Sequence, residues 1–389
     1  MQELLLLLLP VAAASGWFAA RKSATKEKGQ CVGETGPVYF RGLNHLLNEE
    51  PDKAIDAFVE MLEVDSDTVE THLALGSLFR RRGEVERAIR IHQNLIARPA
   101  LTREQRAQAL LELGQDYMRA GLFDRAENLF RELKETKLHV KPALKNLRII
   151  YEKEQDWQAC LDVTDQLESI TGDKMQLQKS HYHCELALCA KAQGRMSDAH
   201  AHLKKALGIY RGCVRANHLQ AQFASLQGDH RTAIKLLRQT VEQEASYLPE
   251  VLPEIVAGYR QLGELQELRS YLQEVAATRP GVGAELATAD LIKEQEGEAA
   301  AASYLAEQLA REPSLTLLLR SIELHSRLPE GHSIQFLESL RPHIRRLLEQ
   351  NPLYQCTNCG FAAKTLHWQC PSCRRWSTLK RRSGGDAEP

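Results

Sequence analysis

Residues 73–92 read LALGSLFRRRGEVERAIRIH, and residues 111–130 read LELGQDYMRAGLFDRAENLF. Both stretches contain a glycine, an aromatic residue three positions later, a second glycine, and then an alanine, and a shift of 38 residues superimposes them. Small residues let two helices approach closely, and the second glycine suits the left-handed conformation that ends a helix. The stretches therefore predict a helical hairpin that recurs along the chain.

The small residue of the second helix marks the period of the repeat. It recurs at spacings of 34 to 39 residues, at Ala54, Ala88, Ala126, Cys160, Ala199, Ala233, Leu268 and Ala302. A turn glycine accompanies most units, at Gly83, Gly121, Gly194, Gly228, Gly263 and Gly297. A unit of about 34 residues with this composition is the tetratricopeptide pattern. We therefore expect an all-α fold, a tetratricopeptide-repeat superhelix over residues 36–350 with about eight units and capping helices. An irregular helical bundle is the alternative.

Stacked hairpins of this kind form a concave wall, lined mainly by first helices, that binds segments of other proteins. The repeat phase gives seven candidates for this protein-binding groove: Glu70, Arg80, Gln115, Lys145, Glu152, Lys191 and Arg215. The alternative for each is an ordinary solvated position. The chain contains no phosphate-loop, dinucleotide, zincin or nucleophile-elbow motif. We therefore expect an adaptor or scaffold and not an enzyme.

The C-terminal segment carries the strongest chemical signal. Two C-x2-C pairs lie ten residues apart, at Cys356, Cys359, Cys370 and Cys373. Four thiolates at this spacing bind one tetrahedral metal ion, either zinc or the iron of a rubredoxin-type site. A fully ligated site leaves no open position, so the metal is expected to be structural and to supply folding free energy to a small module. Residues 351–382 thus predict a rubredoxin-like zinc ribbon.

The same segment is basic and aromatic. Residues 351–383 contain no acidic residue and six cations: Lys364, Arg374, Arg375, Lys380, Arg381 and Arg382. Basic residues interleaved with Phe361, Trp368 and Trp376 suit nucleic-acid binding. The other interpretation, which we favour, is that the aromatic residues pack the ribbon against the last helices of the array.

The N-terminal residues predict a membrane anchor. Residues 4–20 carry no charge and begin with six leucines, and the basic residues Arg21, Lys22, Lys26 and Lys28 follow them. About 20 apolar residues span a bilayer as a helix, and the basic flank faces the cytoplasm. We expect a transmembrane anchor at 1–20, a polar tether at 21–35 and a tail at 383–389. A cleaved signal or a buried apolar helix is the alternative.

The rest of the composition is that of a soluble globular protein. The 389 residues are 43% hydrophobic and 26% charged, with a formal net charge of -1. This near-neutral charge gives no global attraction to nucleic acid or to an anionic surface. A second group of metal-ligand residues occurs at His181, His183, Cys184, His200 and His202. Because residues two apart on a helix point to different sides, we expect packing or surface roles for them.

An N-terminal anchor, a tetratricopeptide array and a four-cysteine ribbon in one chain resemble the lipopolysaccharide assembly protein B family of Gram-negative bacteria. The resemblance covers essentially the whole chain. It is carried by LLLLLLPVAAASGW at 4–17, by GEVERAIRIH at 83–92, and by CTNCGF and HWQCPSCRRWST within 354–378. All four metal thiols match the family's rubredoxin-like domain.

The resemblance implies a single-pass protein of the bacterial inner membrane whose bulk lies in the cytoplasm. It also implies an adaptor that brings LpxC, the deacetylase that commits precursor to lipid A synthesis, to the membrane protease FtsH for degradation. Other lipopolysaccharide assembly proteins are further expected partners, and homodimer formation stays open. The alternative function is a zinc-ribbon nucleic-acid-binding scaffold at the membrane, and nucleic acid is not the expected partner.

Overall fold

A computed structural model describes residues 69–278, 282–311, 314–325 and 352–382, with isolated positions within 40–57 and 341–345. The chain divides into two compact units, Met1–Asp173 and Lys174–Pro389. The predicted anchor at 1–20, the tether at 21–35 and the tail at 383–389 lie outside the described residues. Among the residues that are described, no helix combines the length and the apolar composition that crossing a membrane requires.

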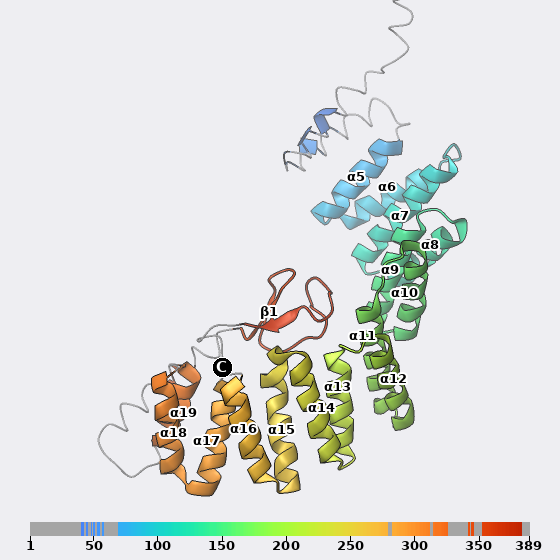
Figure 1. Cartoon of the computed structure of the whole chain (residues 1–389). Helices are drawn as coiled ribbons and strands as arrows, with labels where there is room; N and C mark the ends of the chain where they lie inside the picture. The colour runs from blue at the N-terminus through green and yellow to red at the C-terminus, as the bar shows by residue number, and fades with distance from the viewer. Residues whose placement is uncertain are drawn as a thin grey trace, which may run out of the picture. The chain divides into compact units, whose positions relative to one another are not determined.

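The first unit is a series of helix pairs (Figure 1). A connection of two residues joins the helices of each pair, so the two helices run antiparallel. The described helices are α5 (Val69–Arg82), α6 (Val85–Ile96), α7 (Arg103–Ala120), α8 (Phe123–Thr136), α9 (Val140–Glu154) and α10 (Trp157–Thr171).

The second unit continues the same pattern and adds the C-terminal ribbon. Its helices are α11 (Gln176–Ala192), α12 (Met196–Ile209), α13 (Val214–Leu226), α14 (His230–Gln243), the short 3-10 helix η1 (Ala245–Tyr247), α15 (Leu248–Leu262), α16 (Leu265–Thr278), α17 (Val282–Glu296), α18 (Glu298–Arg311) and α19 (Leu315–His325). The predicted all-α repeat architecture is therefore confirmed over the described residues.

The residues that marked the period occupy the structural positions expected of them. All eight small markers are buried, with exposed fractions between 0% and 3%. All six turn glycines have positive φ, from 73° to 95°, where a side chain would be strained. At the turn between α9 and α10, which has no glycine, Gln155 adopts the same conformation with φ 59°. The repeat geometry thus persists where its sequence pattern is lost.

The glycine of the first helix has a specific packing role. A Cβ atom on Gly76 would lie 2.4 Å from the ring of His92, and one on Gly114 would lie 2.6 Å from Phe130. Both rings belong to the second helix of the same pair and are 0% exposed. The absence of a side chain on the first helix therefore makes room for a ring from the second.

The ribbon is a three-stranded antiparallel sheet with strand order β2-β1-β3. Its strands are β1 (Tyr354–Cys356), β2 (Ala362–Ala363) and β3 (Leu379–Arg381). The β1–β2 hairpin encloses the first C-x2-C turn, where Gly360 has φ 75° and donates its N–H to the carbonyl of Cys356. The third strand follows the second cysteine pair and pairs with the other edge of β1. Both cysteine pairs are thereby attached to one small sheet.

Candidate metal centre

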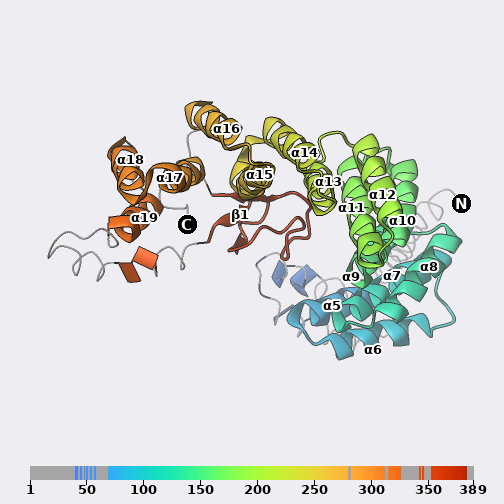
Figure 2. The same cartoon turned by 90° about the horizontal axis from the view of Figure 1, so that it is seen from below.

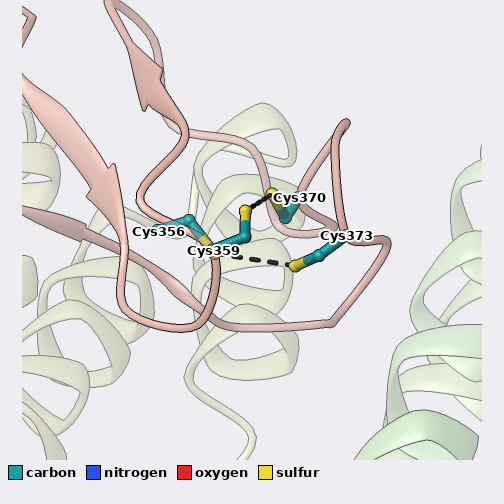
Figure 3. A group of neighbouring side chains, drawn as sticks. All are labelled: Cys356, Cys359, Cys370 and Cys373. Atoms are coloured by element: carbon teal, nitrogen blue, oxygen red, sulfur yellow. Dashed lines mark hydrogen bonds between the residues drawn. The ribbon is translucent and has the colours of Figure 1, made fainter. Parts of the chain in front are cut away.

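The four cysteines converge from two loops of the ribbon on one point (Figure 3). Their sulfur atoms all lie within 4.8 Å of one another. The Sγ–Sγ distance is 3.7 Å both for Cys356–Cys373 and for Cys359–Cys370. A tetrahedron with metal–sulfur bonds of about 2.3 Å has sulfur–sulfur edges of about 3.8 Å, whereas a disulfide bond is about 2.05 Å long. The residues present therefore fit a four-thiolate metal ion.

The surrounding backbone prepares two of these thiols for ionisation. Burial raises the pKa of Cys356, but a hydrogen bond with the Thr378 side chain and hydrogen bonds from nearby backbone N–H groups outweigh it and lower that pKa to about 6. The backbone N–H of Arg375 lowers the pKa of Cys373. Burial raises the pKa of Cys370 to about 11. A bound cation offsets this burial penalty, because metal ligation keeps a thiol deprotonated.

The ribbon packs on the helices of its own unit through stacked rings. Both views place it beside α13 and α15 (Figures 1 and 2). Trp376 stacks on His181, with ring centroids 4.7 Å apart and planes at 15°, and Trp368 stacks on Tyr247 at 5.3 Å and 17°. The guanidinium of Arg215 lies 5.8 Å from the Trp368 ring and 5.7 Å from the Trp376 ring. These five side chains form what we call the ribbon dock.

Ion pairs border the ribbon dock. Lys380 pairs with Glu244, and Arg381 lies 3.4 Å from Glu250. The Tyr354 hydroxyl donates a hydrogen bond of 2.7 Å to the same Glu250 carboxylate.

The expectation that aromatic residues pack the ribbon against helices is confirmed for Trp368 and Trp376, whereas Phe361 packs on the core of the ribbon itself. The expected location on the last helices was wrong. The described contacts come instead from α11, α13, the segment between α14 and α15 that includes η1, and the first turn of α15.

The groove candidates of the first unit lie in different settings. Arg80 and Gln115 line one cavity of about 450 Å³. Glu70 in the first turn of α5 and Lys145 on α9 are exposed. Glu152 on α9 is only 7% exposed. Two of these five candidates therefore share a cavity.

The two groove candidates of the second unit also differ. Lys191 lines a cavity of about 370 Å³, and its ammonium group lies 5.0 Å from the centre of the Phe223 ring. Arg215 is 7% exposed, pairs with Glu185 at 2.9 Å and belongs to the ribbon dock. Its side chain is therefore engaged within this unit.

The sequence did not single out His181 for a role in the ribbon dock, nor did it single out Tyr247. His181 is the more deeply buried of the two. It is 1% exposed, and its Nε2 atom lies 2.7 Å from the Ser377 hydroxyl oxygen. Burial, with a smaller contribution from the charge of Arg215, lowers the pKa of His181 to about 3. Residues 181 and 377 are 196 positions apart, so no local sequence pattern signals the contact.

Acid is expected to weaken the second unit through His181. The unfolded chain takes up a proton near pH 6.5, whereas the folded chain does so only near pH 3, so stability is lost as pH falls below 6.5. At pH 5.5 the loss is roughly 1–2 kcal/mol relative to pH 7.5. Urea unfolding at the two pH values measures it. His181→Gln should reduce the loss, whereas His367→Gln, at an exposed ribbon position, should not. An equal loss in wild type and His181→Gln would contradict the assignment.

Comparison with known proteins identifies both the helical repeats and the four-cysteine ribbon. The family model described as "Rubredoxin metal binding domain" matches residues 354–381, and the one described as "Tetratricopeptide repeat" matches residues 71–107. The chain is similar to lipopolysaccharide assembly protein B of Escherichia coli (strain K12), with 39% identity over 387 residues, covering 99% of this chain and 100% of the relative. The protein of the same name from Haemophilus influenzae is 35% identical, covering 98% of each chain.

Likeness to solved structures is weaker. A structure titled "Structure of Naa15/Naa10 bound to HypK-THB" aligns with 80% of this chain and 46% of that chain, at 12% identity and a TM-score of 0.43. This likeness is too low to bear on function.

Proposed function

The chain belongs to the lipopolysaccharide assembly protein B family, and from this membership we propose that it is a non-enzymatic adaptor of the bacterial inner membrane. In this proposal it recruits the LpxC deacetylase to the FtsH protease for degradation and so regulates lipopolysaccharide biosynthesis. The observation that carries the proposal is the match over 99% of this chain to a relative named for lipopolysaccharide assembly. The match covers the repeats and the ribbon together.

The mechanism requires positioning and no bond chemistry. An anchor at residues 1–20 confines the protein to the plane of the membrane in which the protease lies. The array binds a client protein and raises its effective concentration near the protease. For short tethers such effective concentrations reach the millimolar range. At such concentrations even a weak interaction between the client and the protease is occupied much of the time.

In this proposal the ribbon has a structural role and takes part in no reaction. A zinc or iron ion, when bound, supplies folding free energy by linking the two cysteine loops. Cys356, Cys359, Cys370 and Cys373 would hold the ion and leave it no open position. The ribbon dock then attaches the folded ribbon to α11, α13 and η1, and the hydrogen bond from Tyr354 to Glu250 adds a contact with the start of α15.

The nucleic-acid alternative has less support from the surface of the ribbon. Trp368 and Trp376 each stack on a side chain of the array. One face of each indole ring is therefore covered and cannot stack on a base. Lys380 and Arg381 are paired with carboxylates of the same unit. No described feature favours nucleic acid over protein.

Removal of Met1–Ala20 is expected to abolish client turnover in cells while leaving client capture intact. The reason is that the truncated adaptor still binds the client but no longer concentrates it beside the protease. Client half-life after a block of protein synthesis measures turnover, and affinity capture with purified protein measures binding.

The matched control replaces Met1–Ala20 with an unrelated single-span helix of the same orientation. This version should restore turnover, because the anchor contributes location in this proposal. Normal turnover with the soluble truncation would count against the adaptor mechanism.

A further inference from the structure

A cavity in the first unit has a lining that is unusually rich in positive charge. It has a volume of about 450 Å³, within the range of ~300–1,000 Å³ for ligand pockets. Helices α5, α7 and α9, the first helices of successive pairs, supply its lining: Arg80, Arg81, Gln115, Met118, Arg119 and Asn146. Three guanidinium groups and two amides thus face one space. No described residue of this lining is acidic.

Arg80 is a fixed part of this cavity. Its guanidinium donates to Asp116 at 2.7 Å and to Glu112 at 2.6 Å, and Asp116 is in turn 2.5 Å from Nδ1 of His92. Asp116 is 0% exposed and the Arg80 side chain is 16% exposed. These carboxylates offset the charge of Arg80 and hold it in one orientation.

Arg81 and Arg119 give the cavity positive charge that the carboxylates bound to Arg80 do not offset. Both are exposed, and neither forms an ion pair with another described residue. Each lies in the last turn of its helix, where a cation interacts favourably with the helix dipole. The dipole accounts for a basic residue at each helix end, but it does not require the two to line one cavity with Asn146 from the middle of α9.

We infer that this cavity binds an extended acidic segment of a partner protein. Arg81 and Arg119 pair with two carboxylate side chains of the segment, because a guanidinium matches a carboxylate in shape and charge. Gln115 and Asn146 offer amides to the peptide backbone of the segment. The inference rests on the proposed function, since it names the chemistry of a protein that the adaptor holds.

The test uses labelled octapeptides and the purified full-length protein. The probe is an acetylated, amidated (Gly-Glu)4 peptide, and the matched peptide is (Gly-Gln)4. We expect the acidic peptide to bind at least tenfold more tightly at low salt, with an affinity that falls as salt rises. A (Gly-Gln)4 peptide with a free carboxyl terminus separates recognition of a chain end from recognition of side chains, and it should bind no better than its amidated form.

Variants locate the site. The double variant Arg81→Ala with Arg119→Ala should lower the affinity for the acidic peptide at least tenfold. The double variant Arg81→Lys with Arg119→Lys should bind this peptide more tightly than the alanine pair does. Arg106→Ala is the control, because Arg106 is exposed on α7 but outside the lining, about 220° around the helix from Arg119. It should change the affinity less than twofold.

Several results would overturn the inference. They are equal binding of the acidic and neutral peptides, unchanged binding by the alanine pair, and no binding of any peptide. Client capture by the same preparations is scored separately. If wild type and the alanine pair capture the client equally while the peptide results are negative, the acidic-segment inference fails and the proposed adaptor function stands.

Discussion

Cys370→Ser is expected to remove the metal ion and to unfold the ribbon. Cys370 is 0% exposed, and its sulfur lies 3.7 Å from that of Cys359. A hydroxyl is a much poorer ligand for zinc than a thiolate, and structural zinc contributes about 10–16 kcal/mol in small zinc-dependent domains. The buried core of the ribbon cannot replace such a contribution, because it consists of only five side chains: Tyr354, Cys356, Ala363, Cys370 and Leu379.

The measurements are metal content per chain and limited proteolysis within 352–382. Wild type should carry about one ion per chain, as expected for a single four-thiolate site. The variant should carry almost none and should be cleaved in the ribbon, as should wild type treated with a chelator. Cys189→Ser is the matched control, because Cys189 is exposed on α11 and lies outside the cluster. Full metal content together with a protease-resistant ribbon in Cys370→Ser would refute the structural role of the site.

Trp376→Ala is expected to release the folded ribbon from the helices while the metal stays bound. Trp376 is 6% exposed and contacts His181, Tyr182 and Arg215 of the array. It does not belong to the buried core cluster of the ribbon. Loss of a buried tryptophan costs about 3–5 kcal/mol, and here most of that loss falls on the ribbon dock.

Hydrogen exchange and metal content together test this separation. In Trp376→Ala, exchange around His181 and at 379–381 should accelerate while metal content stays at the wild-type value. The control is Trp157→Ala, because Trp157 in the first unit is similarly buried at 7% exposure. It should destabilise its own unit without changing exchange in the ribbon. Metal loss from Trp376→Ala, or unchanged exchange around His181, would contradict independent docking.

The repeat architecture and the convergence of the four cysteines could be predicted because both depend on local spacing. A turn glycine at Gly83 or Gly121 is required by the backbone at that point, whatever lies elsewhere in the chain. Two C-x2-C pairs likewise define a ligand set by their own spacing. The β-strands of the ribbon were less predictable, because the first cysteine pair itself forms the turn of the hairpin.

The groove candidates show where repeat phase stops being informative. Phase identified the helix face of Arg80 and Gln115, which do line a cavity. It gave no sign that Arg119 lines the same cavity or that Asp116 accepts a hydrogen bond from Arg80. Phase also selected Arg215, whose side chain is engaged by Glu185 and two ribbon indoles.

Local patterns of residues were thus enough to specify the period of the array, the conformation of its turns and the four cysteines that converge. The packing of the ribbon on His181 and Tyr247, and the cavity lined by three arginines from two helices, follow from long-range folding alone. The two groups of features differ in the range of the constraints that specify them. Turn conformation and ligand spacing act over a few residues and leave a repeated mark, whereas complementarity between two surfaces depends on side chains brought together from distant positions.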